Sequence, residues 1–345
     1  MLPAHAGVIP CDSVAAMPTV LVAPDSFKGT FSAVEVAAAI GRGLERAGLE
    51  ADLCPVADGG EGTMSVLLTS IGGRTVDVGV RDPLGRPMTA PFALLGDGRR
   101  ALVEMAAASG LALIAAEERD PWVTTTYGTG QLIRAAVEAG AQEIMVAVGG
   151  SATVDGGRGA LEAIADGGGL DGARIVVLCD VQTTWEDCPR IYGPQKGATP
   201  EMVGRLEQRL DALAAELPRD PRGVPMTGAA GGLSGGLWAG LGASLEPGAP
   251  YVLDAVRFDE RLRRAVAAIA GEGQIDEQSV LGKIVGEIGE RAGRAGVQLH
   301  AIVGSNAVPA DAAERIALRS VREATTLDQI EATAETLGRE VDGGR

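Results

Sequence analysis

Three reactive side chains follow the first apolar run of the chain. Residues 20–23 are Val-Leu-Val-Ala, and after Pro24 come Asp25, Ser26 and Lys28. A carboxylate can take up a proton or hold a hard cation, and an ammonium group can neutralise an anion. Ordinary polar residues of a strand–helix connection would give the same composition, so both interpretations stay open for this loop alone.

The flanking residues predict a buried strand before this loop and a helix after it. Four consecutive apolar residues are typical of a strand covered on both faces. Ser32 and Glu35 form an S-x-x-E capping box, and Val36, Ile40 and Leu44 recur at helical spacing. Ligands of open α/β sheets bind at the carboxyl ends of the strands. We therefore expect the reactive side chains at such an edge.

Other predicted strands also end in acids, hydroxyls and glycines. Glycines let a ligand approach the backbone, and paired carboxylates can hold a hard cation, although an Asp-Gly turn explains one such cluster equally well. If the strands form one parallel sheet, all the clusters share its carboxyl edge. The clusters are Asp58–Glu61 after residues 51–57, Glu272–Asp276 after residues 265–270, and Ser305–Asn306 after residues 299–303.

The middle of the chain contains a candidate phosphate-binding loop. Residues 143–148 predict a strand, residues 149–157 read Gly-Gly-Ser-Ala-Thr-Val-Asp-Gly-Gly, and a helix is expected over residues 158–165. Successive glycines expose backbone N–H groups, Ser151 and Thr153 add donors, and a helix N-terminus follows. A flexible glycine loop is the alternative interpretation.

Further candidates in this middle part are ambiguous when taken singly. Asp180 follows a predicted strand and could be a base, a Mg²⁺ ligand or a plain turn residue. Gln195 and Lys196 precede the helix cap at Thr199 and could face a ligand. Residues 124–130 could bind an anion or cap a helix expected from Gln131.

Glycines also concentrate in residues 228–236, which contain five glycines in a short span that either admits a ligand or lets helices pack closely. A short helix is expected over residues 104–111.

Composition narrows the class of protein. The 345 residues include 46% hydrophobic but only 3% aromatic residues, together with 50 glycines, which is typical of an α/β protein with many strand–loop–helix units. The net charge of −16 argues against nucleic acid or an acidic membrane surface as a partner. The chain has only 2 histidines, and its 4 cysteines form no C-x-x-C pair. A bound metal would therefore need oxygen ligands, which indicates Mg²⁺ or Ca²⁺. Reduced thiols and a cytoplasmic location are expected.

A change of pattern predicts two domains. Residues 74–103 read as a meander of hairpins without crossover helices, and βα units return after Tyr251. We expect a discontinuous domain of residues 19–66 and 255–345, and an inserted domain of residues 67–254. Residues 1–18 do not read as a secretory signal, so we expect a start at Met17 or a disordered extension.

The candidate clusters contain acidic residues, lysines and glycine-rich loops but no histidines. This combination suits phosphoryl transfer with Mg²⁺, in which positioning and charge neutralisation supply most of the catalysis.

Seven motifs follow one another between about residue 19 and about residue 307. They are APDSFKGT (23–30), PVADGGEGT (55–63), TTYGTGQLI (125–133), GGSATVDGG (149–157), YGPQKGAT (192–199), GAAGGLSGG (228–236) and GEGQIDEQS (271–279). In this order they resemble the two-domain bacterial glycerate kinases. This resemblance implies ATP-dependent phosphorylation of D-glycerate, more often to 2-phosphoglycerate than to 3-phosphoglycerate, in organic acid catabolism. It also implies a flavodoxin/Rossmann-like parallel-sheet domain with a second α/β domain inserted, and an active site between them.

The resemblance and the residue chemistry together assign hypothetical roles. Asp180 takes the substrate proton, with Asp25 as the competing base, and Lys28 and Lys196 neutralise the transferred phosphoryl group. Asp58, Glu61 and Asp276 hold Mg²⁺ directly or through water. The predicted substrate and phosphate ligands are Ser26, Gly149, Gly150, Ser151, Thr153, Gln195, Gly231 and Gly232. The predicted nucleotide ligands are Gly59, Gly60, Gly271, Glu272, Gly273 and Ser305.

Two departures affect the expected substrate. Residues 181–192 lack the N-P-L-x-G pattern of the family and are shorter, and Ala270 replaces a usual Thr. The chain thus looks like a divergent subgroup. A kinase of another small hydroxy acid, or a non-catalytic sensor of small molecules, remains an alternative. We expect a monomer or homodimer without nucleic acid or membrane partners.

Overall fold

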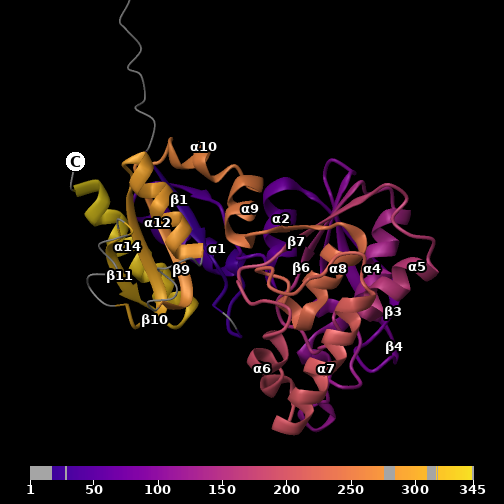
Figure 1. Ribbon diagram of the computed structural model, residues 1–345. Helices are drawn as coiled ribbons and strands as arrows, with labels where there is room; N and C mark the ends of the chain where they lie inside the picture. The colour runs from indigo at the N-terminus through magenta and orange to yellow at the C-terminus, as the bar shows by residue number, and fades with distance from the viewer. Residues whose placement is uncertain (1–17, 28, 276–283, 309–315, 317, 344–345) are drawn as a thin grey trace, which may run out of the picture.

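The computed structural model describes residues 18–27, 29–275, 284–308, 316 and 318–343, and it contains two β-sheets flanked by helices (Figure 1). The α/β class predicted from the sequence is confirmed. No helix within these residues is both long and apolar enough to span a membrane. Met17 and the preceding residues lie outside the described ranges, as do Lys28 and Asp276.

The first sheet combines both ends of the chain. Its strand order is β11-β10-β9-β1-β2, and every neighbouring pair is parallel. The strands are β1 (Thr19–Pro24), β2 (Glu50–Leu53), β9 (Ala267–Ile275), β10 (Gln298–Asn306) and β11 (Leu318–Glu323).

Helices cover both faces of the first sheet. On one face α1 (Ala33–Arg46) and α14 (Leu327–Gly343) pack on a core that includes Val22 and Ile302, and on the other lies α12 (Ile284–Ala295). The predicted capping box of α1 is confirmed, since Ser32 and Glu35 bond each other's backbone N–H.

The second strand is shorter than predicted. β2 ends at Leu53 rather than Ala57 and is partly exposed, because it forms the edge of the sheet. The N–H groups of Cys54 and Val56 still donate to the carbonyl oxygens of Val22 and Pro24, so the chain continues beside β1.

The second sheet is built from the middle of the chain, in the order β3-β4-β5-β6-β7-β8. The first three strands form the predicted antiparallel meander, and β5 to β8 are parallel. The helix expected over residues 104–111 is shorter in the structure, where α3 spans only Ala106–Ser109, because Glu104 is the last residue of a strand. The strands are β3 (Gly73–Arg81), β4 (Pro87–Leu95), β5 (Arg100–Glu104), β6 (Glu143–Ala147), β7 (Arg174–Leu178) and β8 (Ser244–Glu246).

Helices surround the second sheet. As predicted, α7 (Pro200–Glu216) begins after a Thr199 cap, whose Oγ1 accepts from the N–H of Met202. Short 3₁₀ turns, among them η3 (Pro194–Lys196) and η4 (Ala229–Gly232), connect them. The other helices are α4 (Tyr127–Glu138), α5 (Arg158–Asp166), α6 (Cys188–Tyr192), α7 (Pro200–Glu216) and α8 (Leu233–Leu241).

Two helices lie where the chain passes between the sheets. α2 (Thr63–Ile71) follows β2, and α9 (Gly248–Ala255) precedes α10 (Phe258–Leu262) and β9. Figure 1 shows α2 and α9 between the two sheets. Both helices join one core that reaches from Leu21 in the first sheet to Met145 in the second. The predicted cuts at 66/67 and 254/255 pass through these helices, so the division into domains stays a proposal.

Candidate active site

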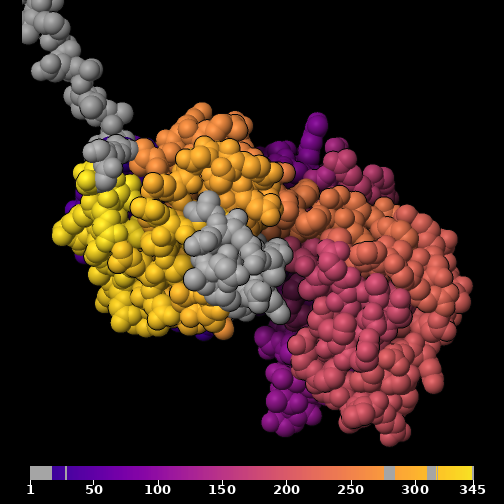
Figure 2. Space-filling view, turned by 60° about the vertical axis from the view of Figure 1, so that its left-hand side comes forward, coloured from indigo at the N-terminus to yellow at the C-terminus, as the bar shows by residue number. Residues whose placement is uncertain are grey.

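The carboxyl ends of strands from both sheets border one cleft. The segment after β1 and the segment after β6 line a common cavity of about 540 Å³, which contains Ser26 and residues 29–32 on one side and Gly149 and Gly150 on the other. Figure 2 shows the lobe of the C-terminal segments beside the lobe of the middle segment. Parallel strands bring distant polar residues to one edge in this way.

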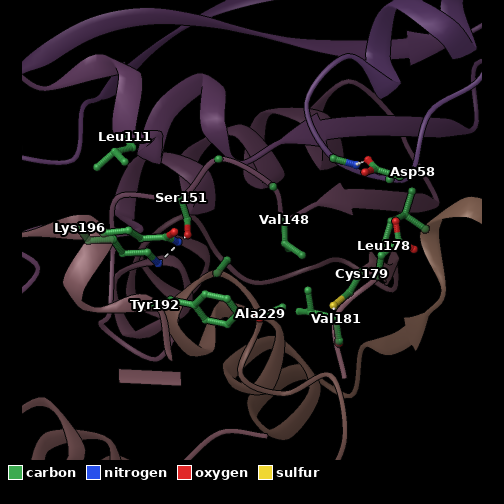
Figure 3. Close-up of a pocket in the computed structure, with 17 residues that line it drawn as sticks. Asp58, Leu111, Val148, Ser151, Leu178, Cys179, Val181, Tyr192, Lys196 and Ala229 are labelled. Atoms are coloured by element: carbon green, nitrogen blue, oxygen red, sulfur yellow. Dashed lines mark hydrogen bonds between the residues drawn. The ribbon is translucent and has the colours of Figure 1, made fainter. Parts of the chain in front are cut away.

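A second cavity of about 400 Å³ continues from the first, and Asp58, Gly60, Gly149 and Gly150 belong to both. Its polar lining comes from Asp58, Ser151, Asp180, Gln195 and Lys196. We call the first the β1 cavity and the second the Lys196 cavity. The two cavities share their acidic part at Asp58. Figure 3 shows the Lys196 cavity, with Asp58 on one side and the cationic Lys196 on the other.

The turn at Asp58 presents both a carboxylate and backbone to the cavities. Asp58 Oδ1 accepts from the N–H of Gly60 at 3.0 Å. A Cβ at Gly59 would lie 2.7 Å from the Cα of Gly248, so close packing on α9 requires glycine there. Glu61 lines the β1 cavity with Asp58. Two predicted metal ligands thus lie in one wall.

The predicted phosphate loop, residues 149–157, contributes only its first half to the cavities. Gly149, Gly150 and Ser151 line the Lys196 cavity, whereas Thr153 is buried behind it. The N-termini of α4 and α5, which the sequence indicated as candidate anion-binding sites, donate their N–H groups to Asp155 of the same chain.

Asp155 is the internal anion of this loop. Its Oδ2 accepts from the N–H and Oγ1 of Thr126, each at 2.8 Å, and from the N–H of Gly159 at 3.2 Å. Its Oδ1 accepts from the N–H of Gly157 at 3.1 Å. A buried carboxylate therefore occupies the start of α4 and α5, and α4 begins at Tyr127, earlier than the predicted Gln131.

Lys196 places a buried ammonium group at the cavity wall. The residue is 1% exposed, and its Nζ donates to Ser151 Oγ at 2.7 Å and to the carbonyl oxygen of Thr153 at 2.8 Å. Burial lowers the pKa of this amine to about 8, with Cys188 and Asp155 opposing the shift. Figure 3 shows Lys196 and Ser151 together, across the cavity from Asp58.

The two candidate bases differ in position. Asp180 follows β7, lines the Lys196 cavity and accepts from the N–H groups of Gly248 at 3.0 Å and Ala249 at 3.2 Å. Asp180 thereby also caps α9. Asp25 is 4% exposed, accepts from the N–H of Ser26 at 2.6 Å and lines neither cavity.

The glycines of residues 228–236 serve close packing. A Cβ at Gly231 would lie 1.9 Å from the carbonyl oxygen of Thr153, and one at Gly236 would lie 2.1 Å from that of Gly156. Neither Gly231 nor Gly232 lines the two cavities. Of the two interpretations left open by the sequence, the structure supports packing at these positions.

The ends of β9 and β10 lie beside β1 but outside the lining of both cavities. Gly271 pairs with Pro24, Glu272 with Val303, and Ser305 with Gln274, which keeps Gly271–Gly273 and Ser305 at the carboxyl edge. Ala270, which departs from the family pattern, is buried in the core.

Most of the apolar lining was not identified from the sequence. Apart from the thiol of Cys179, these residues carry no reactive group, and their position depends only on how the strands and turns are assembled. Tyr192 and Val181 of the divergent segment are also in the lining, and the Tyr192 hydroxyl contacts Thr183 Oγ1 at 2.8 Å. The unpredicted apolar residues include Leu111, Val148, Leu178, Cys179, Ala229 and Ala230.

The described residues contain no group of three or more His, Cys, Asp or Glu side chains arranged to hold a metal ion. Asp276, the third predicted ligand, lies outside them, so the predicted trio stays a prediction.

Comparisons with known proteins agree with this architecture. The chain matches the model of the glycerate kinase family over residues 20–166 and 168–341. It is 41% identical over 301 residues to a glycerate kinase of Bacillus subtilis (strain 168), covering 76% of this chain and 79% of that one. It is 37% identical over 302 residues to a glycerate 2-kinase of Escherichia coli (strain K12), covering 77% and 79%.

A solved structure extends the match to the fold. A crystal structure described as a glycerate kinase 2 from Salmonella typhimurium LT2 has a TM-score of 0.83 and 35% identity, and covers 95% of this chain and 99% of that chain. The seven ordered motifs, the family match and this fold lead to one conclusion: the chain is a member of the glycerate kinase family, and hence a kinase.

Proposed function

We propose that this chain phosphorylates D-glycerate with ATP at the 2-hydroxyl group, in organic acid catabolism. The name of the Escherichia coli relative, glycerate 2-kinase, favours this position over the 3-hydroxyl. The observation that carries the proposal is the pair of joined cavities, because two substrates bound in them would meet at the shared Asp58, Gly60, Gly149 and Gly150.

The Lys196 cavity is the proposed glycerate end. Its buried ammonium group can pair with the substrate carboxylate or with the phosphoryl group in transfer, and the low-dielectric surroundings strengthen either interaction. Ser151 and Gln195 add hydrogen-bonding groups to the same wall. Lys28 remains a second proposed cation for the phosphoryl group.

The β1 cavity is the proposed nucleotide end, where residues after β1 face the Asp58 turn. Asp58 and Glu61 offer the carboxylate oxygens that suit Mg²⁺, and we propose that they hold it with Asp276, directly or through water. Bound Mg²⁺ would neutralise phosphate charge. The proposed nucleotide ligands remain Gly59, Gly60, Gly271, Glu272, Gly273 and Ser305. Of these, Gly60 lines the β1 cavity, Gly59 lines the Lys196 cavity, and the other four lie at the neighbouring ends of β9 and β10.

Asp180 is the proposed base for the glycerate hydroxyl. It lines the Lys196 cavity, as a base must if it is to reach the substrate, whereas Asp25 does not. Its Oδ1 is engaged at the start of α9, which would fix the orientation of the carboxylate. Asp25 remains the alternative.

The direct test is ADP formation that depends on D-glycerate, with the product identified by ³¹P NMR. The proposal predicts 2-phosphoglycerate. A product phosphorylated at the 3-hydroxyl would correct the position only. Faster turnover of another hydroxy acid in a panel would change the substrate, and ligand binding without any ADP formation would favour the sensor.

A further inference from the structure

Glu104 links a strand of the second sheet to the turn that carries Asp58. It is the last residue of β5, and its Oε1 accepts from the N–H of Gly62 at 3.0 Å and from the N–H of Met64 at 2.8 Å. Those groups begin α2, which leaves the first sheet. The contact therefore fastens two sheets together directly beside the β1 cavity.

The start of α2 has no cap of its own. Its N-cap is Gly62, which has no side chain, and the first turn contains no acidic residue. Helices leave their first N–H groups without partners inside the helix, and a negative charge there is favourable. Glu104 supplies both the acceptor and the charge from 42 residues away.

A chain of hydrogen bonds runs from Glu104 to the Asp58 carboxylate. Thr63, between the two bonded N–H groups, donates from Oγ1 to the carbonyl oxygen of Gly60 at 2.7 Å. The N–H of Gly60 in turn donates to Asp58 Oδ1 at 3.0 Å. Moving the start of α2 would therefore move the carboxylate that lies in both cavities.

The same strand end also holds the opposite wall. The N–H of Met105 donates to the carbonyl oxygen of Ala147 at 2.9 Å, just before Gly149. The two walls touch there, since a Cβ at Gly149 would lie 3.0 Å from the Cα of Gly60.

Burial raises the pKa of Glu104, and the nearby Glu61 carboxylate raises it further. The hydrogen bonds from the N–H groups of Met64 and Gly62 act in the opposite direction and lower this pKa.

We propose that Glu104 is a positioning residue, which holds the Asp58–Gly62 turn against the Gly149–Gly150 wall and thereby orients Asp58 and Glu61. Glu104 itself lines neither cavity. The effect on turnover rests on the proposed function, whereas the effect on the turn rests on the hydrogen bonds alone.

The test compares three variants of the full-length protein by kinetics and by hydrogen exchange. Glu104→Ala should lower kcat about 30-fold through misplacement of the carboxylates, with the KM for glycerate changed less than about threefold. Amide exchange over residues 59–64 should become faster. Glu104→Gln keeps an acceptor oxygen, so it should recover kcat to within about fivefold of the wild type.

Asp97→Ala is the matched control. Asp97 Oδ1 also accepts two backbone N–H groups, from Arg99 at 2.9 Å and Arg100 at 3.0 Å, but at the other end of β5. This variant should keep wild-type kcat and unchanged exchange over residues 59–64.

Unchanged exchange over residues 59–64 in folded Glu104→Ala, or a wild-type kcat, would overturn the proposal. If the alanine variant does not fold, Glu104→Gln decides, because its weaker neutral acceptor should still give faster exchange there than the wild type, and equal exchange would contradict the proposal. If the wild type makes no ADP with glycerate, the proposed function fails, and the exchange result still decides whether Glu104 holds the turn.

Discussion

The Asp58–Gly62 turn and the Gly149–Gly157 loop are both rich in glycine and contain acidic residues, but they are held in different ways. Both contain acids and glycines, and both lead into a helix. The start of α2 after the first is closed by Glu104 from the other sheet. The start of α5 after the second is closed by Asp155 from within the loop.

The Gly149–Gly157 wall of the cleft is held by residues of the second sheet and its loops alone. The Asp58–Gly62 wall is held only when both sheets are in place. Asp155 and Lys196 fix the second loop through contacts among residues of the middle segment. The first turn reaches its position only when α2 packs against β5. We therefore expect substitutions in the second loop to act through local stability and charge, and those around the first through the packing between sheets.

The largest effect should come from removing the cation of the second loop. Lys196→Met should lower kcat/KM for glycerate about 10²- to 10³-fold, because a buried ammonium group in the cavity wall is lost. Arg205→Met, which removes an exposed cation stacked on Trp122, is the control and should keep kcat/KM. A Lys196 variant within threefold of the wild type would exclude a catalytic role for this amine.

The next largest effect is on stability and comes from Asp155, the buried carboxylate that caps α4 and α5. Asp155→Ala leaves four hydrogen-bond donors without their acceptor in the interior, so the free energy of unfolding should fall by about 3 kcal/mol. Asp220→Ala, at an exposed turn, should change it far less, because solvent screens an exposed ion pair. Equal urea midpoints for the two variants would contradict the importance of Asp155.

A pH series sharpens the same contrast. Burial lowers the pKa of Lys196 from 10.5 to about 8, so the unfolded chain binds the proton more tightly between these values. The contribution of this amine to the free energy of unfolding should therefore rise with pH across this window, by up to about 3 kcal/mol.

Urea unfolding at pH 7, 8.5 and 10 checks this, with Lys196→Met as the reference that cannot titrate. The wild type should gain stability relative to that variant as the pH rises, and parallel curves would contradict a lowered pKa. The kcat/KM of the wild type should fall above about pH 8, because the ammonium form is lost.

The smallest expected effect is on stability and comes from Gly62→Ala, which tests whether the Asp58–Gly62 turn depends on the left-handed backbone conformation of Gly62. Gly62 has φ 95°, and a Cβ there meets nothing within 4 Å, so Gly62→Ala should lose only about 1–2 kcal/mol for the left-handed conformation. Gly204→Ala, in the open on α7, should gain about 0.5–1 kcal/mol. Thermal unfolding measures both. A kcat loss in Gly62→Ala as large as that of Glu104→Ala would show that the turn, rather than the remote carboxylate, limits positioning.

The parts of the fold predicted well were those with local causes. The Ser32–Glu35 capping box, the Thr199 cap and the hairpins of residues 74–103 follow from neighbouring residues, and the structure confirms them. The prediction was wrong where a residue's partner lies far away. Glu104 was assigned to a helix although it ends β5. At residues 124–130 the sequence left anion binding and helix capping both open, because the acceptor Asp155 lies 29 residues from Thr126.

The sequence by itself determined the α/β class, the polar clusters at strand ends and the family, because apolar periodicity and ordered motifs are written along the chain. Only the tertiary structure decided which carboxylate closes which helix and how deeply Lys196 is buried. Asp180 and Gly248 are 68 residues apart, and Glu104 and Gly62 are 42 apart. Hydrogen bonds of such range leave no local pattern, since they form only when the two sheets pack around α2 and α9.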